Sequence, residues 1–254
     1  MYFGNNRLGW KILEWLRGEG EDVVGLAVHP PGRSKFGDEI VRAAALPPSA
    51  IFGASQLRDP GVQHAIGHLR PEIGISVLFG YILRPELLER FPAGVINLHP
   101  SLLPWNRGAC PNVWSILDHT PAGVSLHYVD AGIDTGDVIA RETVAVEPVD
   151  TGGSLYGKLE QASFELFCRA WPEVRERRAG RTLQSPQEGT RHTLRELESI
   201  AEIDLDSQYT GRQLIDILRA RTFPPYAGAF FRAGDRRVHM RLELEYADEP
   251  HADN

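Results

Sequence analysis

The first half of the chain alternates short apolar runs with segments whose apolar residues recur at helical spacing. Residues 23–28, 73–79 and 94–98 have the length and composition of strands buried in a sheet. Between these runs, apolar residues repeat every three or four positions, as over residues 8–16 and 62–69. Strands that alternate with helices at these lengths form βαβ units. The sequence therefore predicts an α/β fold with a Rossmann-like, doubly wound, mostly parallel sheet.

The second half of the chain is expected to continue this domain before the pattern changes. A strand pair is predicted over residues 122–129 and 138–146, followed by a long helix that begins near Thr151. Pro172 is expected to bend or end that helix, because proline lacks the N–H that an interior turn requires. The first domain is therefore predicted to span residues 1–180.

The remainder is predicted to be a small α+β appendage over residues 193–246. A segment rich in Gly, Ser, Gln, Thr and Arg at 181–192 is expected to be a linker. The appendage is expected to hold one helix near 211–219 and a hairpin of two strands, at 229–232 and 237–246. Residues 247–254 are expected to be a disordered tail.

Composition excludes several functional classes. The 254 residues are 42% apolar and 24% charged, which is typical of a globular protein with a sizeable core. The net charge of −7 gives no general attraction to nucleic acid or to anionic membranes. No apolar stretch approaches a membrane span and no signal pattern opens the chain, so a cytoplasmic location is expected. Cys110 and Cys168 lie far apart without metal-binding spacing, so neither a disulfide framework nor a metal site is expected.

Polar side chains gather where one predicted strand ends. Asn97 and His99 close the apolar run at 94–98, and residues two apart on a strand point to the same side. In doubly wound sheets, ligands bind at the carboxyl ends of the strands. Asp134 lies farther along the chain in a glycine-flanked loop. An amide, an imidazole and a carboxylate would form a candidate acyl-transfer site if these three residues converge.

Each of the three residue types suits acyl transfer to an amine. Asn97 could donate to the oxyanion of a tetrahedral intermediate, a contribution of about 3 kcal/mol. His99 could accept the amine's proton or, when charged, support the oxyanion. Asp134, bonded to His99, would fix its tautomer and raise its pKa. No Ser or Cys nucleophile occupies a strand-to-helix elbow, and G-N-N-R-L-G at 4–9 is not a dinucleotide fingerprint. Direct transfer is therefore favoured over a covalent intermediate or hydride chemistry.

Three motifs in order resemble the 10-formyltetrahydrofolate-dependent formyltransferase family over about residues 1–180. They are N-L-H-P-S-L-L-P at 97–104, R-G at 107–108 with Pro111 and Trp114, and G-I-D-T-G at 132–136. The resemblance implies the formyltransferase fold, direct formyl transfer by Asn97, His99 and Asp134, and 10-formyltetrahydrofolate as co-substrate. It further implies that the folate lies against two loops, largely through backbone contacts, at Phe79, Gly80, Tyr81, Ile82, Leu83, Asp130 and Ile133.

The acceptor is indicated by the P-W-N-R-G variant at 104–108, by P-N-V-W at 111–114 and by the segment 219–229. These stretches are most similar to enzymes of lipopolysaccharide biosynthesis that formylate dTDP- or UDP-linked amino sugars, such as dTDP-4-amino-4,6-dideoxyglucose. Residues 181–246 hold 10 Arg against 10 Asp plus Glu, so they offer no basic excess for tRNA. The resemblance implies a possible homodimer and acceptor contacts at Asn6, Ser101, Trp105, Asn106, Arg107, Asn112 and Tyr226.

Several alternatives stay open at this point. The chain could be a methionyl-tRNA formyltransferase-like enzyme, or a formyl hydrolase in which water replaces the amine. It could also be a binding module for folate or a nucleotide sugar. Arg107 could simply be a solvated residue at a helix entry, and Tyr226 a core residue. His127 lies near the proposed site in sequence and is assigned no role.

Overall fold

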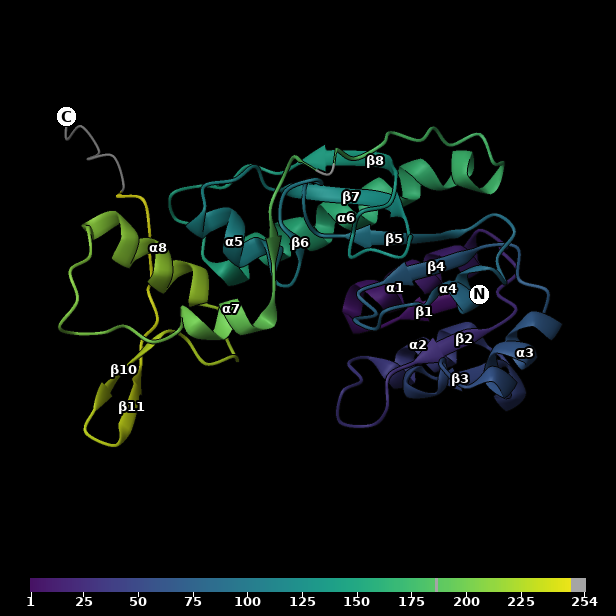
Figure 1. The fold of residues 1–254 in the computed structure, drawn as a ribbon, viewed down its shortest axis with the longest axis horizontal. Coiled ribbons are helices and arrows are strands. Elements are labelled where there is room, and N and C mark those ends of the chain that lie inside the picture. Colours follow the sequence, from purple (N-terminus) through teal and green to yellow (C-terminus); the bar gives the residue numbers. More distant parts are fainter. Residues whose placement is uncertain (186, 248–254) are drawn as a thin grey trace, which may run out of the picture.

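The computed structural model describes residues 1–185 and 187–247, and its centre is a seven-stranded sheet (Figure 1). The strand order is β3-β2-β1-β4-β5-β7-β8. Pairing is parallel from β3 to β5, whereas β7 and β8 are antiparallel additions. The mostly parallel α/β fold is thus confirmed. The strands are β1 (Tyr2–Gly4), β2 (Leu26–Val28), β3 (Ile51–Gly53), β4 (Gly74–Val77), β5 (Val95–His99), β7 (Gly123–Tyr128) and β8 (Val138–Thr143).

Helices cover both faces of this sheet, as doubly wound topology requires. Neighbouring residues of β1 show the two cores: Tyr2 packs with helices α1, α2 and α6, whereas Phe3 packs with α3 and α4. This alternation follows from the two-residue period of a strand. The helices are α1 (Asn6–Gly18), α2 (Gly37–Ala44), α3 (Pro60–His68), α4 (Pro85–Leu88), α5 (Pro111–Leu117) and α6 (Gly152–Arg175), with single 3-10 turns at Pro48–Ala50 and Ala54–Gln56. No helix in the described ranges has the length and apolarity to cross a membrane.

The C-terminal part forms a smaller unit beside the sheet (Figure 1). It consists of α7 (Leu194–Ser199), α8 (Gly211–Arg221) and the hairpin of β10 (Phe230–Ala233) and β11 (Arg236–His239). Helix α8 packs against α5 and α6. In α8, buried Arg219 donates to Asp216 at 2.7 Å and to the carbonyls of Glu147 and Asp150 at 3.2 and 3.1 Å. These bonds attach the C-terminal helix to the main domain.

Two details differ from the sequence predictions. Helix α6 does not end at Pro172 but continues to Arg175, because Trp171 and Val174 are buried on either side of the proline and hold the last turn in place. The second hairpin strand stops at His239 rather than at residue 246. Beyond it the chain leaves the hairpin, and Leu242 N–H donates to the Thr222 hydroxyl instead of to a strand.

The segment predicted as a linker is joined to the main domain by backbone pairing. Its last residues form β9 (Arg191–His192), which runs parallel to the short β6 (Arg107–Gly108). Near its start, Thr182 forms an isolated antiparallel bridge with Val138. Of the predicted tail at 247–254, residues 248–254 lie outside the described residues.

The attachment of α8 gives a prediction for stability. Arg219→Ala leaves the buried Asp216 carboxylate without its guanidinium partner, so the free energy of unfolding should fall by about 3–5 kcal/mol. Arg212→Ala, on the exposed side of the same helix, is the matched control and should change it little. Urea denaturation followed by circular dichroism measures both values. Equal stability of the two variants would contradict this account of how the helix is attached.

Candidate active site

A cavity of about 1130 Å³ lies at the carboxyl ends of the parallel strands. Asn6 follows β1, the segment from Leu78 to Leu83 follows β4, and Asn97 and His99 come from β5. The cavity extends to the C-terminal part, where Tyr226 contributes to the wall. The fold thus places the predicted residues where ligands bind in doubly wound sheets.

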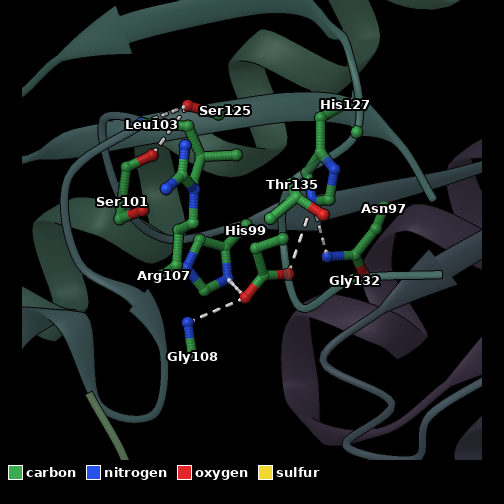
Figure 2. A network of polar contacts seen from close by, with 12 residues as sticks. Asn97, His99, Ser101, Leu103, Arg107, Gly108, Ser125, His127, Gly132 and Thr135 are labelled. Atoms are coloured by element: carbon green, nitrogen blue, oxygen red, sulfur yellow. Dashed lines mark hydrogen bonds and ion pairs between the residues drawn. The ribbon is translucent and has the colours of Figure 1, made fainter. Parts of the chain in front are cut away.

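Asn97, His99 and Asp134 all line this cavity, so the three residues converge. Figure 2 shows the polar contacts around Asn97, His99 and His127. The Nε2–H of His99 donates to the Asn106 carbonyl at 3.1 Å, because a carbonyl can only accept. The other ring nitrogen, Nδ1, therefore faces Asp134 Oδ2, which lies 3.6 Å away. That oxygen also accepts the backbone N–H of Gly108 at 2.9 Å. Nδ1 is thus the ring nitrogen that remains able to take up a proton.

Burial and charge act in opposite directions on the two ionisable groups. Burial lowers the pKa of His99, and although the Asp134 carboxylate raises it, the net shift is downward. Asp134 thus acts on the His99 pKa in the predicted direction, but burial outweighs it. Burial also raises the pKa of Asp134, but His99, His127 and the Gly108 N–H lower it more, so that it falls well below its usual range. A neutral imidazole thus faces a charged carboxylate at neutral pH.

His127, which the sequence analysis left without a role, belongs to this cluster. Strand β7 runs antiparallel to β5 and pairs His127 with Asn97. The His127 Nδ1–H donates to the Tyr128 carbonyl at 2.8 Å, and its Nε2 accepts from the Asn97 amide at 3.1 Å. The same nitrogen lies 3.5 Å from Asp134 Oδ1. The sequence held a signal for this position. Val124, Leu126 and Tyr128 alternate along β7, which assigns His127 to the face of the strand opposite to theirs.

The loops predicted to hold the folate line the cavity. All of their named residues contribute: Phe79, Gly80, Tyr81, Ile82, Leu83, Asp130 and Ile133. The Phe79 side chain is itself buried in the core beside Phe3, so only its backbone is open to a ligand in the cavity. Apolar Leu78, Val129 and Ile133 supply side-chain surface that a flat ring could cover.

Of the predicted acceptor contacts, Asn6, Asn112 and Tyr226 line the cavity, whereas four others do not. The four outside the cavity wall are Ser101, Trp105, Asn106 and Arg107. The Asn106 side chain is fully buried and bonded to Ser115, Thr120 and Thr190. Asn106 therefore contacts His99 through its carbonyl from outside the cavity wall.

Cationic side chains also line the cavity. They are those of Arg7, Lys35, Arg191 and Arg221, and Arg7 forms an ion pair with Glu160 at 3.1 Å. The Lys35 ammonium contacts the Tyr226 hydroxyl and lies 4.7 Å from the centre of its ring. The Nε of Arg221 is buried without a hydrogen-bond partner among the described residues. These side chains suit an anionic ligand. No group of three or more His, Cys, Asp or Glu in the described part of the chain could hold a metal ion.

The opposing effects on His99 give a pH prediction. Asp134→Asn removes the carboxylate that raises the His99 pKa, so this pKa should fall further below its ordinary value. As the pH falls below about 6.5, the unfolded chain takes up a proton on His99 while the folded chain does not, so the free energy of unfolding decreases until the pH reaches the folded pKa. Because the folded pKa is lower in the variant, this decrease should extend over a wider pH range. NMR titration of the His99 imidazole measures the shift. Asp130→Asn, whose carboxylate bonds within its own loop, is the control; an unchanged His99 pKa in Asp134→Asn would refute the assignment.

Two family models match the chain. The formyl transferase model matches residues 7–171, and the model of the N-formyltransferase dimerization C-terminal domain matches residues 196–246. The first covers well over half of the chain and includes Asn97, His99 and Asp134. The second covers most of the predicted appendage.

Solved structures agree with the family models. A 4-N formyltransferase from Francisella tularensis is 28% identical over 97% of both chains, with a TM-score of 0.81. The formyltransferase PseJ from Anoxybacillus kamchatkensis is 32% identical, covering 68% of this chain and 87% of its own, with a TM-score of 0.55. A sugar N-formyltransferase from Shewanella shares the fold at 20% identity, over 97% of both chains, with a TM-score of 0.83. The resemblance inferred from the motifs is thus confirmed: the chain belongs to the formyl transferase family and is an N-formyltransferase.

Proposed function

We propose that this enzyme transfers the formyl group of 10-formyltetrahydrofolate to the amine of a nucleotide-linked 4-amino sugar. One observation carries the proposal: Asn97, His99 and Asp134 line a cavity whose wall also holds apolar loop residues and cationic side chains. The apolar residues include Leu78, Val129 and Ile133, and the cationic side chains include Arg7, Lys35 and Arg221. The co-substrate binds against the apolar loop residues and supplies the activated formyl carbon, and the nucleotide of the acceptor binds at the cationic side chains.

The three polar residues have distinct roles in this proposal. Attack of the amine nitrogen on the formyl carbon places negative charge on the formyl oxygen. His127 accepts one N–H of the Asn97 amide, and the second N–H is available to donate to that oxygen. His99 Nδ1 accepts the proton that the amine releases, and Asp134 stabilises the resulting imidazolium. The same proton then passes to the folate nitrogen as its bond to the formyl carbon breaks.

The acceptor class is supported by charge and by two relatives. A nucleoside diphosphate carries negative charge that Arg7, Lys35 and Arg221 would neutralise, and Tyr226 offers an aromatic face beside them. The Francisella relative is a 4-N formyltransferase. The Anoxybacillus relative was solved with UDP-4,6-dideoxy-4-formamido-L-AltNAc and tetrahydrofolate. Both are more than 25% identical to this chain, and both concern the amine at position 4.

The proposed activity is tested with purified enzyme, 10-formyltetrahydrofolate and a 4-amino sugar linked to dTDP or UDP. Mass spectrometry should find a product heavier by one CO unit, and the same amino sugar without its nucleotide should react far more slowly. The acceptor assignment fails if formyl-methionyl-tRNA forms while no nucleotide sugar reacts. Release of formate in the absence of any acceptor would instead support a hydrolase, and binding without turnover would support a non-catalytic module.

The same assay tests the residue roles. Asn97→Ala and His99→Ala should each lower kcat by about 10²-fold or more. His64→Ala, on the exposed surface of α3, should retain the activity of the unaltered enzyme. Circular dichroism confirms that each variant is folded. Near-normal turnover in both Asn97→Ala and His99→Ala would show that the reaction takes place elsewhere.

We also propose a homodimer formed through the C-terminal part. The matching C-terminal model is that of a dimerization domain, and the exposed apolar side chains there include Leu205, Ile215 and Val238. Light scattering should give about twice the 28.3 kDa of one chain, and Ile215→Asp should shift the mass towards a monomer. The control is Arg212→Asp, on the same helix. A mass of one chain at micromolar concentration would contradict the proposal.

A further inference from the structure

The segment between the two family matches contacts the catalytic loops directly. This connecting segment, residues 182–185 and 187–192, follows the stretch matched by the formyl transferase model and precedes the C-terminal match. It bridges to Val138 at its start and pairs with β6 at its end. In its middle, Gln184 points its amide at the loop that carries Asp134.

The Gln184 amide joins two loops. Its Nε2 donates to the carbonyls of Asp134 at 2.9 Å and of Gly136 at 2.7 Å. Its Oε1 accepts from Nε and Nη2 of Arg107 at 3.1 and 2.9 Å. A primary amide has two N–H donors and one oxygen with two lone pairs. Every hydrogen-bonding position of this side chain is therefore used between the Asp134 loop and Arg107.

The Asp134 loop needs such support because its backbone conformation is unusual. Asp134 has a φ of 54°, in the left-handed region that side-chain-bearing residues disfavour. At Gly136 a Cβ atom would lie 1.9 Å from the Tyr128 carbonyl, so the chain passes close to β7 there. The two bonds from Gln184 connect the carbonyls on either side of Thr135. They hold the turn that directs the Asp134 carboxylate towards His99 and the Gly108 N–H.

Arg107 completes the connection from the other side. It is 8% exposed, and its guanidinium also donates to the carbonyls of Ser185 and Glu188 at 3.4 Å each. The residue after it, Gly108, supplies the N–H that binds Asp134 Oδ2. The bond between Arg107 and Gln184 thus connects the strand that carries the donor, Gly108, to the loop that carries the acceptor, Asp134.

We infer that Gln184 is a positioning residue for formyl transfer, acting through Asp134 and with Arg107 as its anchor. The inference rests on the proposed function of Asp134. Gln184 does not touch the substrates in this account. Its loss would let the Asp134 loop relax, so that the carboxylate no longer faces His99 Nδ1 when that atom takes up the proton. A displacement of about 1 Å in such a group lowers turnover by about 10²-fold.

The test compares two glutamines of the same segment. Gln184→Ala should lower kcat by about 10- to 100-fold. Its Kd for tetrahydrofolate and its KM for the acceptor should stay within about threefold, because the lost bonds lie outside the cavity wall. Gln187→Ala is the matched control, since its exposed side chain bonds to the Ser185 hydroxyl and not to a catalytic loop. If both variants have the turnover of the unaltered enzyme, the inference is overturned.

A double-mutant cycle separates a positioning role from a general structural one. Gln184→Ala is combined with Asp134→Asn, and kcat is measured for each single variant and for the pair. If Gln184 acts through Asp134, its loss should cost little in the Asp134→Asn enzyme. Equal losses in both backgrounds would overturn the inference, because Gln184 would then act independently of the carboxylate.

These variants also distinguish a failure of the proposed active site from a failure of the role proposed for Gln184. Normal turnover in Asp134→Asn would refute the proposed site itself. Impaired Asp134→Asn together with normal Gln184→Ala would refute this inference alone. If Gln184→Ala does not fold, Gln184→Glu takes its place throughout. It keeps an oxygen for Arg107 and loses the two donors to the loop, and the same losses of kcat are expected from it.

Discussion

One buried carboxylate connects the polar residues of the candidate active site. Asp134 lies 3.6 Å from His99 and 3.5 Å from His127, and it accepts the Gly108 N–H at 2.9 Å. These contacts outweigh the desolvation caused by burial and keep the carboxyl pKa well below its usual range. A buried charge destabilises the fold when it loses its partners, so each loop that supplies a partner must keep its position. This requirement explains much of the polar structure around the cavity.

The partners of Asp134 come from distant parts of the chain, and the sheet brings them together. His99 ends β5, whereas His127 lies on β7, whose antiparallel register places it beside Asn97. Gly108 follows Arg107 in β6, which is held by β9 of the connecting segment. The cavity that results is lined by these polar residues together with apolar loop residues and cationic side chains.

The sequence predicted much of the fold and part of the site. Alternating apolar runs gave the mostly parallel sheet, and the two-residue spacing of Asn97 and His99 gave their common direction. Motif position was a poor guide to contact with the cavity, because Asn106 and Arg107 lie outside its wall and bond to His99 and Gln184 instead. Pro172 does not end α6, because burial of its neighbours carries the helix on to Arg175.

Features that depend on residues close in sequence could be predicted from the chain, whereas contacts between distant residues could not. Strand period and helix spacing depend on neighbouring residues, so the chain itself determined the sheet and the common direction of Asn97 and His99. The bonds from Gln184 to Asp134 and from Arg107 to Gln184 span 50 and 77 residues. Such contacts depend on the register of β7 against β5 and on the path of the connecting segment. Tertiary structure alone decided them, because no local pattern specifies which distant donor meets a given acceptor.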